Sequence, residues 1–146
     1  MNEFTDILYN RMIWAALLGT VSAQLLKVFI VWLSDRVLDW SLLFSSGGMP
    51  SSHTGAVVAL TVSVGRFSGW GSSIFAISLV HAIIVMYDAA GVRRSAGDQA
   101  RILNILITQF PDLQELRREQ LRELLGHTPI EVVAGAALGI VMGNLV

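Results

Sequence analysis

One polar stretch decides how this chain folds, and it reads Gly47-Gly48-Met49-Pro50-Ser51-Ser52-His53-Thr54-Gly55. It separates two apolar segments. Because proline suits the start of a helix and a serine hydroxyl caps the free amides there, we expect a helix to begin at this point. Unpaired N–H groups and the positive end of the helix dipole favour an anion at such a terminus. His53 would stand in the first turn, able to exchange a proton with that anion. The alternative is a loop whose histidine has no such role.

The composition is that of a membrane protein. Of the 146 residues, 53% are hydrophobic and 14% are charged, and the mean hydropathy is +0.61. A soluble domain of this size carries about a quarter charged residues. A net charge of −1 gives no bulk attraction to nucleic acid, and the lack of cysteine excludes disulfides and thiolate chemistry. We therefore expect a single domain over residues 1–146, all-α and integral to the cell membrane, without a nucleic-acid partner.

Residues 12–33 predict the first membrane-spanning helix. The segment has 22 residues and one charge, which is about the length that a bilayer core requires. Trp14 and Trp32 near its ends fit the aromatic belts of a membrane interface. The one charge, Lys27, comes three positions after Gln24, so both side chains share a helix face. Lys27 either extends its ammonium to the interface or faces a polar site inside the bundle.

Further segments complete a bundle of about four to five membrane helices. They are the apolar residues 55–64, 73–90 and 129–146, a helix expected around 101–107, and an amphipathic surface helix at 113–125. His81, within the 73–90 segment, is expected to be a packing residue rather than a catalyst. Gly135, Gly139 and Gly143 recur every four residues and form a small-residue seam. That seam would pack against a helix of the same chain or against a second protomer in a homodimer.

The spans bring most of the polar groups to one side of the membrane. If the chain crosses at 12–33 and 73–90 and returns between and after them, one side collects a set of charged or titratable residues: His53, Asp88, Arg93, Arg94, His127 and Glu131. Lys27 also lies nearer that side. Arginines outside the spans are more numerous there, so the positive-inside rule predicts a multi-pass protein whose motif side is cytoplasmic.

Two histidines among cationic groups suggest phosphoryl chemistry without a bound metal. Arg93 and Arg94 offer planar donor forks for phosphate oxygens, and Lys27 adds a point charge. One imidazole would attack phosphorus to form a phosphohistidine while the other protonates the leaving oxygen. The two histidines would also suit zinc, but acidic or thiolate ligands at metal spacing are missing. We therefore expect neither a metal nor a cofactor.

The second candidate stretch is His127-Thr128-Pro129-Ile130-Glu131. Thr128 and Glu131 form a capping box, with proline at the first helical position between them. Glu131 is also placed to hold the imidazole of His127 in one tautomer, as the acid of a catalytic triad does. The two roles of the glutamate are compatible.

Three blocks resemble the divergent branch of the type 2 phosphatidic acid phosphatase (PAP2) family, which is related to acid phosphatases and vanadium haloperoxidases. The blocks are Gly48-Met49-Pro50-Ser51-Ser52-His53, Tyr87-Asp88-Ala89-Ala90-Gly91-Val92-Arg93-Arg94 and Gly126-His127-Thr128-Pro129-Ile130-Glu131-Val132. With Gln24 and Lys27 they cover most of the chain. The resemblance implies a PAP2-like helical bundle.

The resemblance also implies roles for single residues. The histidine of the family's Pro-Ser-Gly-His block is the general acid, and His53 ends the similar block here. A histidine followed four positions later by an aspartate supplies the nucleophile and its orienting acid, a spacing that His127 and Glu131 match. Lys27 resembles the lysine of the first family block. The expected phosphate-binding residues are Lys27, Arg93, Arg94, Ser51, Ser52 and Gly48, with Gln24 and Asp88 in support.

Two positions depart from the main family pattern. An arginine-proline pair is expected where Ser34 and Asp35 stand, and an arginine is expected at Leu121, which precedes Arg122. Arg93 and Arg94 are the candidates for the missing guanidinium groups.

The resulting prediction is hydrolysis of a lipid or isoprenoid phosphate at the membrane surface. The alternative is a non-catalytic protein that binds or transports phospholipids through the same anion pocket. A third reading is a structural subunit assembled through the glycine seam.

Overall fold

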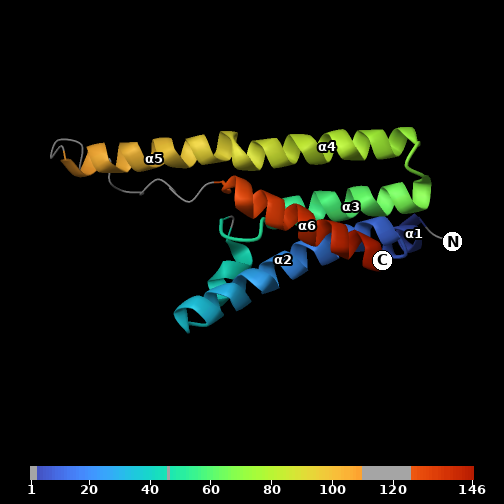
Figure 1. The fold of residues 1–146 in the computed structure, drawn as a ribbon, viewed down its shortest axis with the longest axis horizontal. Coiled ribbons are helices and arrows are strands. Elements are labelled where there is room, and N and C mark those ends of the chain that lie inside the picture. Colours follow the sequence, from blue (N-terminus) through green and yellow to red (C-terminus); the bar gives the residue numbers. More distant parts are fainter. Residues whose placement is uncertain (1–2, 46, 110–125) are drawn as a thin grey trace.

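The computed structural model describes residues 3–45, 47–109 and 126–146, and every regular element in these ranges is helical (Figure 1). The elements are α1 (Glu3–Leu8), α2 (Arg11–Asp35), the 3₁₀ helix η1 (Trp40–Phe44), α3 (Ser52–Ser68), α4 (Ser73–Ala90), α5 (Val92–Gln109) and α6 (Pro129–Leu145). The predicted all-α class is confirmed. The amphipathic helix expected at 113–125 lies outside the described residues.

Helix α3 is the centre of the bundle, with α2, α4 and α6 packed around it (Figure 1). The glycine seam of α6 makes the closest of these contacts. An added Cβ on α6 would meet backbone oxygens of α3 at three places: Gly135 against Ser51 at 2.5 Å, Gly139 against Gly55 at 2.8 Å and Gly143 against Ala59 at 2.6 Å. The seam is therefore occupied within the chain. A homodimer across it stays a prediction that a single chain does not test.

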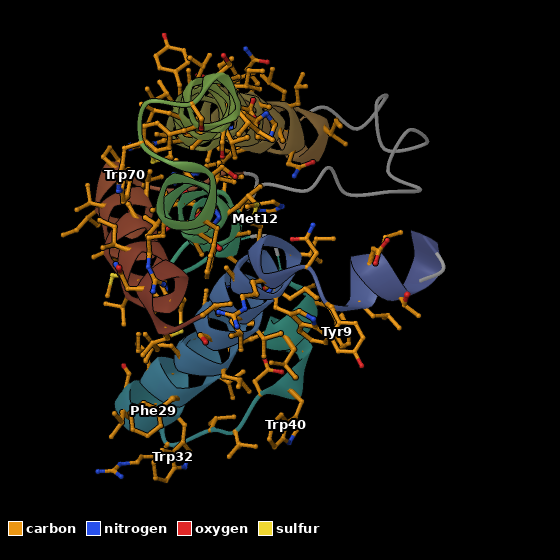
Figure 2. The ribbon with its side chains drawn as sticks, turned by 90° about the vertical axis from the view of Figure 1, so that its right-hand side faces the viewer. Tyr9, Met12, Phe29, Trp32, Trp40 and Trp70 are labelled. Atoms are coloured by element: carbon orange, nitrogen blue, oxygen red, sulfur yellow. The ribbon has the colours of Figure 1, made fainter. Side chains whose placement is uncertain are left out.

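The interior of the bundle is made of small residues, whereas large apolar side chains point outward. Ala15, Ala23 and Ala59 are fully buried, but Leu25 is 52% exposed and Ile77 is 70% exposed. Figure 2 shows aromatic side chains along the rim of the bundle in the same outward orientation. Helices surrounded by lipid gain little from burying apolar groups against each other, so small residues that permit close approach dominate their contacts.

Two stretches are long and apolar enough to cross a membrane, namely α2 and the run Ser73–Ile107 through α4 and α5. Trp14 and Trp32 lie near the two ends of α2 and are separated by about 27 Å at the usual helical rise. That distance is close to the roughly 30 Å thickness of a hydrocarbon core. Trp40 of η1 lies on the same side as Trp32 (Figure 2). Helix length and the two tryptophans therefore make α2 a candidate membrane span.

The helix boundaries differ from the predicted ones where polar residues extend a helix. The apolar segment predicted at 55–64 is part of a 17-residue helix, α3, because Ser51 caps polar residues that form its first turn. At the other end, Arg66 belongs to α3 and donates to the carbonyl oxygens of Gly143 and Asn144, each at 2.9 Å. This arginine therefore satisfies the C-terminal carbonyls of α6. The segment between α2 and α3 contains η1, which Asp39 caps.

The expectation that His81 is a packing residue is wrong. Helix α4 meets α3 through one face, on which Ala82 and Ala89 are buried and Ser78 shares hydrogen bonds with Thr61. His81 lies on a different face of α4 and is exposed. Among the described residues, α4 is packed on the side that meets α3, and His81 does not lie on that side.

Replacing Gly139 with alanine tests the close contact of α3 and α6. The new Cβ would lie 2.8 Å from both the Gly55 oxygen and the Val58 Cβ, so the helices must separate. We expect the variant to lose about 1–3 kcal/mol of stability, the usual cost of overpacking, measured by unfolding in detergent micelles. Gly71→Ala is the control, because nothing lies within 4 Å of its added Cβ. Equal stability of the two variants would contradict the packing described.

Candidate functional site

His127 is held by two hydrogen bonds, one from its backbone and one from its ring. Its N–H donates to the Ala89 carbonyl at the end of α4 (2.9 Å), and its side chain is 3% exposed. The ring Nδ1 lies 3.0 Å from Oε2 of Glu131. Because an ionised carboxylate only accepts hydrogen bonds, Nδ1 carries the proton and Nε2 keeps its lone pair. That Nε2 is buried without a hydrogen-bond partner in the described residues. The result is an imidazole ring whose orientation is fixed by the Glu131 carboxylate.

Glu131 performs both tasks that its position in the sequence predicts. Its carboxylate accepts from the Thr128 backbone N–H (3.2 Å), and its own N–H donates to the Thr128 hydroxyl (3.4 Å), which completes a capping box. Pro129 occupies the first turn. The cap fixes the carboxylate at the start of α6, and the same oxygen then orients the imidazole of His127.

The start of α3 is joined to the start of α6 through the backbone. The N–H of Ser51 donates to the carbonyl of Glu131 (3.0 Å). The Ser51 hydroxyl caps α3 by accepting from the N–H of Thr54 (3.4 Å) and from its hydroxyl (3.1 Å), as predicted for this stretch. Ser51 is fully buried and Ser52 is 5% exposed. The two candidate motifs therefore form one structural unit despite their separation in sequence.

The two histidines of these motifs face the same region. The ring centroids of His53 and His127 lie 6.5 Å apart, with the ring planes at 61°. His53 stands in the first turn of α3 and is exposed, whereas His127 is buried. A tetrahedral group between such rings can contact a nitrogen of each. Sequence reasoning anticipated this convergence, and the roles of the two rings stay predictions.

Lys27 lies inside the protein and does not reach for the membrane interface. Its side chain is 2% exposed, and its ammonium donates to the Ser45 carbonyl (3.3 Å) and hydroxyl (3.4 Å). Gly48, at a φ of +86°, covers the stem, because an added Cβ there would lie 3.4 Å from Cδ of Lys27. Lys27 therefore forms a polar cluster with Ser45 at the segment that leads into α3.

Ser45 is the residue of this cluster that sequence reasoning missed. Its carbonyl also accepts from Nε2 of Gln24 (3.5 Å), so it links both polar residues of α2 to the segment before α3. The Oε1 atom of Gln24 is buried without a partner in the described residues. The only signal in the sequence was the position of Ser45 just ahead of the glycines. Its main-chain carbonyl accepts both bonds, and every residue type has such a carbonyl, so the sequence does not reveal this role.

The remaining candidates lie at the junction of α4 and α5. Asp88 is half-buried in the last turn of α4, one residue before the carbonyl that holds His127. Arg93 and Arg94 stand in the first turn of α5, and the Arg94 side chain is exposed. Their part in binding an anion stays a prediction. Within the described ranges, no group of three or more His, Cys, Asp or Glu side chains is placed to hold a metal ion.

A sequence model of the divergent PAP2 family matches residues 8–142, a range that includes Lys27 and both histidines of the site. The chain belongs to the divergent PAP2 family. It is similar to a Bacillus subtilis (strain 168) protein described as "Uncharacterized membrane protein YuiD", with 43% identity over 148 residues, 94% of either chain. No solved structure matches the chain. The predicted family is thus confirmed, and so is the membrane character of this divergent PAP2 protein.

The tautomer of His127 can be measured directly, because the chain has only three histidines. We expect ¹⁵N NMR of histidine-labelled protein to show His127 protonated at Nδ1, with the signal assigned by its loss in His127→Asn. Glu131→Ala removes the acceptor and should shift the ring toward the Nε2–H form. Glu131→Gln keeps an acceptor oxygen and should preserve the Nδ1–H form. A ring protonated at Nε2 in the native protein would contradict the assigned geometry.

Proposed function

We propose that this divergent PAP2 protein is a multi-pass membrane phosphatase that hydrolyses a lipid or isoprenoid phosphate through a phosphohistidine at His127. One observation carries the proposal: the imidazole that Glu131 holds has an Nε2 with no hydrogen-bond partner among the described residues, and the centroids of the His53 and His127 rings lie 6.5 Å apart. A nucleophile oriented by a carboxylate and faced by a second titratable ring is the arrangement that covalent acid–base catalysis requires.

The first half-reaction transfers the phosphoryl group to the enzyme. The Nε2 lone pair of His127 forms a bond to phosphorus as the bond from phosphorus to the lipid oxygen breaks. Protonated His53 gives its proton to that leaving oxygen, which departs as an alcohol. Glu131 remains hydrogen-bonded to Nδ1–H and stabilises the positive charge that the ring acquires.

The second half-reaction restores the enzyme. His53, now neutral, takes a proton from water while the water oxygen attacks phosphorus. The nitrogen–phosphorus bond breaks and its electron pair returns to Nε2 of His127. Inorganic phosphate leaves, and His53 holds the proton for the next cycle.

Fixed hydrogen-bond donors around the two rings would stabilise the negative charge on the phosphoryl oxygens. The ammonium of Lys27 is already buried, and the start of α3 presents backbone amides with the positive end of its dipole. Gly48 covers the lysine stem, while Ser51 caps the helix start and Ser52 is buried beside it. Arg93 and Arg94 would close the clamp from the α4–α5 junction.

A lipid fits this site better than a soluble ester does. The two histidines stand at the starts of α3 and α6 and beside the end of α4, so they lie at helix ends and not along the apolar faces. A phosphate at the membrane surface reaches that level while its tail stays in the bilayer. By the positive-inside rule, we place this side in the cytoplasm.

The second candidate is a protein that binds or transports phospholipids without hydrolysing them. It is favoured by the 3% exposure of His127 and by the absence of arginine at the two family positions occupied by Ser34 and Leu121. The same pocket would then hold the anion without turnover.

Phosphate release from purified protein in mixed micelles distinguishes these functions. With a panel of lipid and isoprenoid phosphates, we expect turnover that chelators do not reduce, and at least a hundredfold loss in His127→Ala, in line with about 10²–10⁴-fold contributions of such groups. Acid-labile ³²P bound to the native protein but not to His127→Ala would identify the intermediate. His81→Ala is the matched control, because it removes a histidine from outside the site.

Two results would contradict hydrolysis at this site. One is turnover that survives His127→Ala, and the other is an absence of turnover on every substrate. If no substrate turns over but lipid phosphates bind and the binding falls on replacing Lys27, the binder is favoured.

A further inference from the structure

We propose that α4 carries an interface with a second copy of this chain. Helix α4 lies on the outside of the bundle, against α3 (Figure 1). The face that meets α3 is marked by the buried Ala82 and Ala89 and by the bonds between Ser78 and Thr61. No described residue covers the neighbouring face, which carries a histidine among its apolar side chains.

The open face of α4 carries a seam with the spacing of a coiled coil. Ile74, Ile77, His81 and Ile84 follow one another at intervals of three, four and three residues. The three isoleucines are 53%, 70% and 59% exposed, and His81 is exposed as well. Alternation of three and four places residues along one line that faces a partner helix, and β-branched isoleucine is common in such seams. The pattern is that of a helix-packing surface.

His81 is the feature that lipid alone does not accommodate. It lies eight residues after Ser73 and nine before Ala90, so about 12 Å of helix separates it from either end of α4. An imidazole is too short to reach water across that distance. It has no hydrogen-bond partner in the described part of the chain. Polar and ionisable residues at such a depth almost always face protein or a water-filled cavity, because lipid offers them no hydrogen bonds.

The chemistry of this seam favours a copy of itself as the partner. A neutral imidazole has one donor and one acceptor nitrogen, so two histidines related by a twofold axis can hydrogen-bond to each other. Two copies with the same orientation in the membrane present α4 in parallel, which sets His81 opposite His81 between flanking isoleucines. One polar residue in an apolar seam fixes the register of a pair. This face is distinct from the glycine seam of α6, which α3 already covers.

The natural lack of cysteine makes a cross-linking experiment clean. In native membranes, the full-length variants Ile77→Cys and Ile84→Cys should form a disulfide-linked species of twice the monomer mass on mild oxidation. Ile83→Cys is the matched control, because Ile83 is 52% exposed but lies on another side of α4 than Ile84 does. Ile140→Cys, 50% exposed on α6, controls for random collisions. We expect little cross-linking from either control.

The contribution of the histidine is measured by resonance energy transfer between labelled copies diluted in liposomes. We expect His81→Leu to weaken association about three- to thirtyfold, the range of one interhelical hydrogen bond in a membrane. His81→Gln keeps a donor and an acceptor and should recover much of the loss.

Three results would overturn the proposal. They are cross-links as strong at Ile83 as at Ile84, cross-links from Ile77 and Ile84 only to a different protein, and association unchanged in His81→Leu.

Discussion

The hydrogen bond from the Ser51 amide to the Glu131 carbonyl joins the starts of two helices that are far apart in sequence. Around it, α6 lies so close to α3 that an added Cβ on Gly135 would meet the Ser51 oxygen at 2.5 Å. This proximity places one imidazole from each helix start against a shared space. If the helices moved apart by the width of a side chain, the two rings would belong to separate surfaces. The proximity of the two rings therefore depends on the lack of side chains at Gly135, Gly139 and Gly143 of α6.

The same small residues explain how so short a chain holds a buried cation within a membrane bundle. An interior of alanine and glycine gives close contacts but few apolar side chains to cover Lys27. The segment between α2 and α3 does so instead, since Ser45 supplies two acceptors to the ammonium and Gly48 packs along its stem. An ammonium held this way is buried and fixed in position, so an incoming phosphate would find it already oriented.

Much of this architecture could be predicted from the sequence, because the residues that determine it lie close together along the chain. Hydropathy located α2 and α4, and proline with serine or threonine located the starts of α3 and α6. The capping box of Thr128 and Glu131 and the pairing of Glu131 with the His127 ring also follow from spacing alone. The convergence of the histidines followed from counting crossings.

The features that could not be predicted from the sequence depend on tertiary contacts. The length of α3 depends on Arg66 reaching the end of α6, and the position of Lys27 depends on a main-chain carbonyl of Ser45. Packing also decides which face of α4 the described residues cover. The sequence does not show which face that is, so it predicted a packing residue at His81, which is exposed. Hydropathy reports how apolar a helix is but does not report how many sides of it are covered.

A structure with vanadate bound tests the central claim most directly, because vanadate adopts the geometry of a phosphoryl group in transfer. The account predicts vanadium bonded to Nε2 of His127, with an oxygen within hydrogen-bond distance of His53 and another near Lys27. Vanadate bound elsewhere on the protein, or bound between the helix starts with His127 turned away, would contradict it.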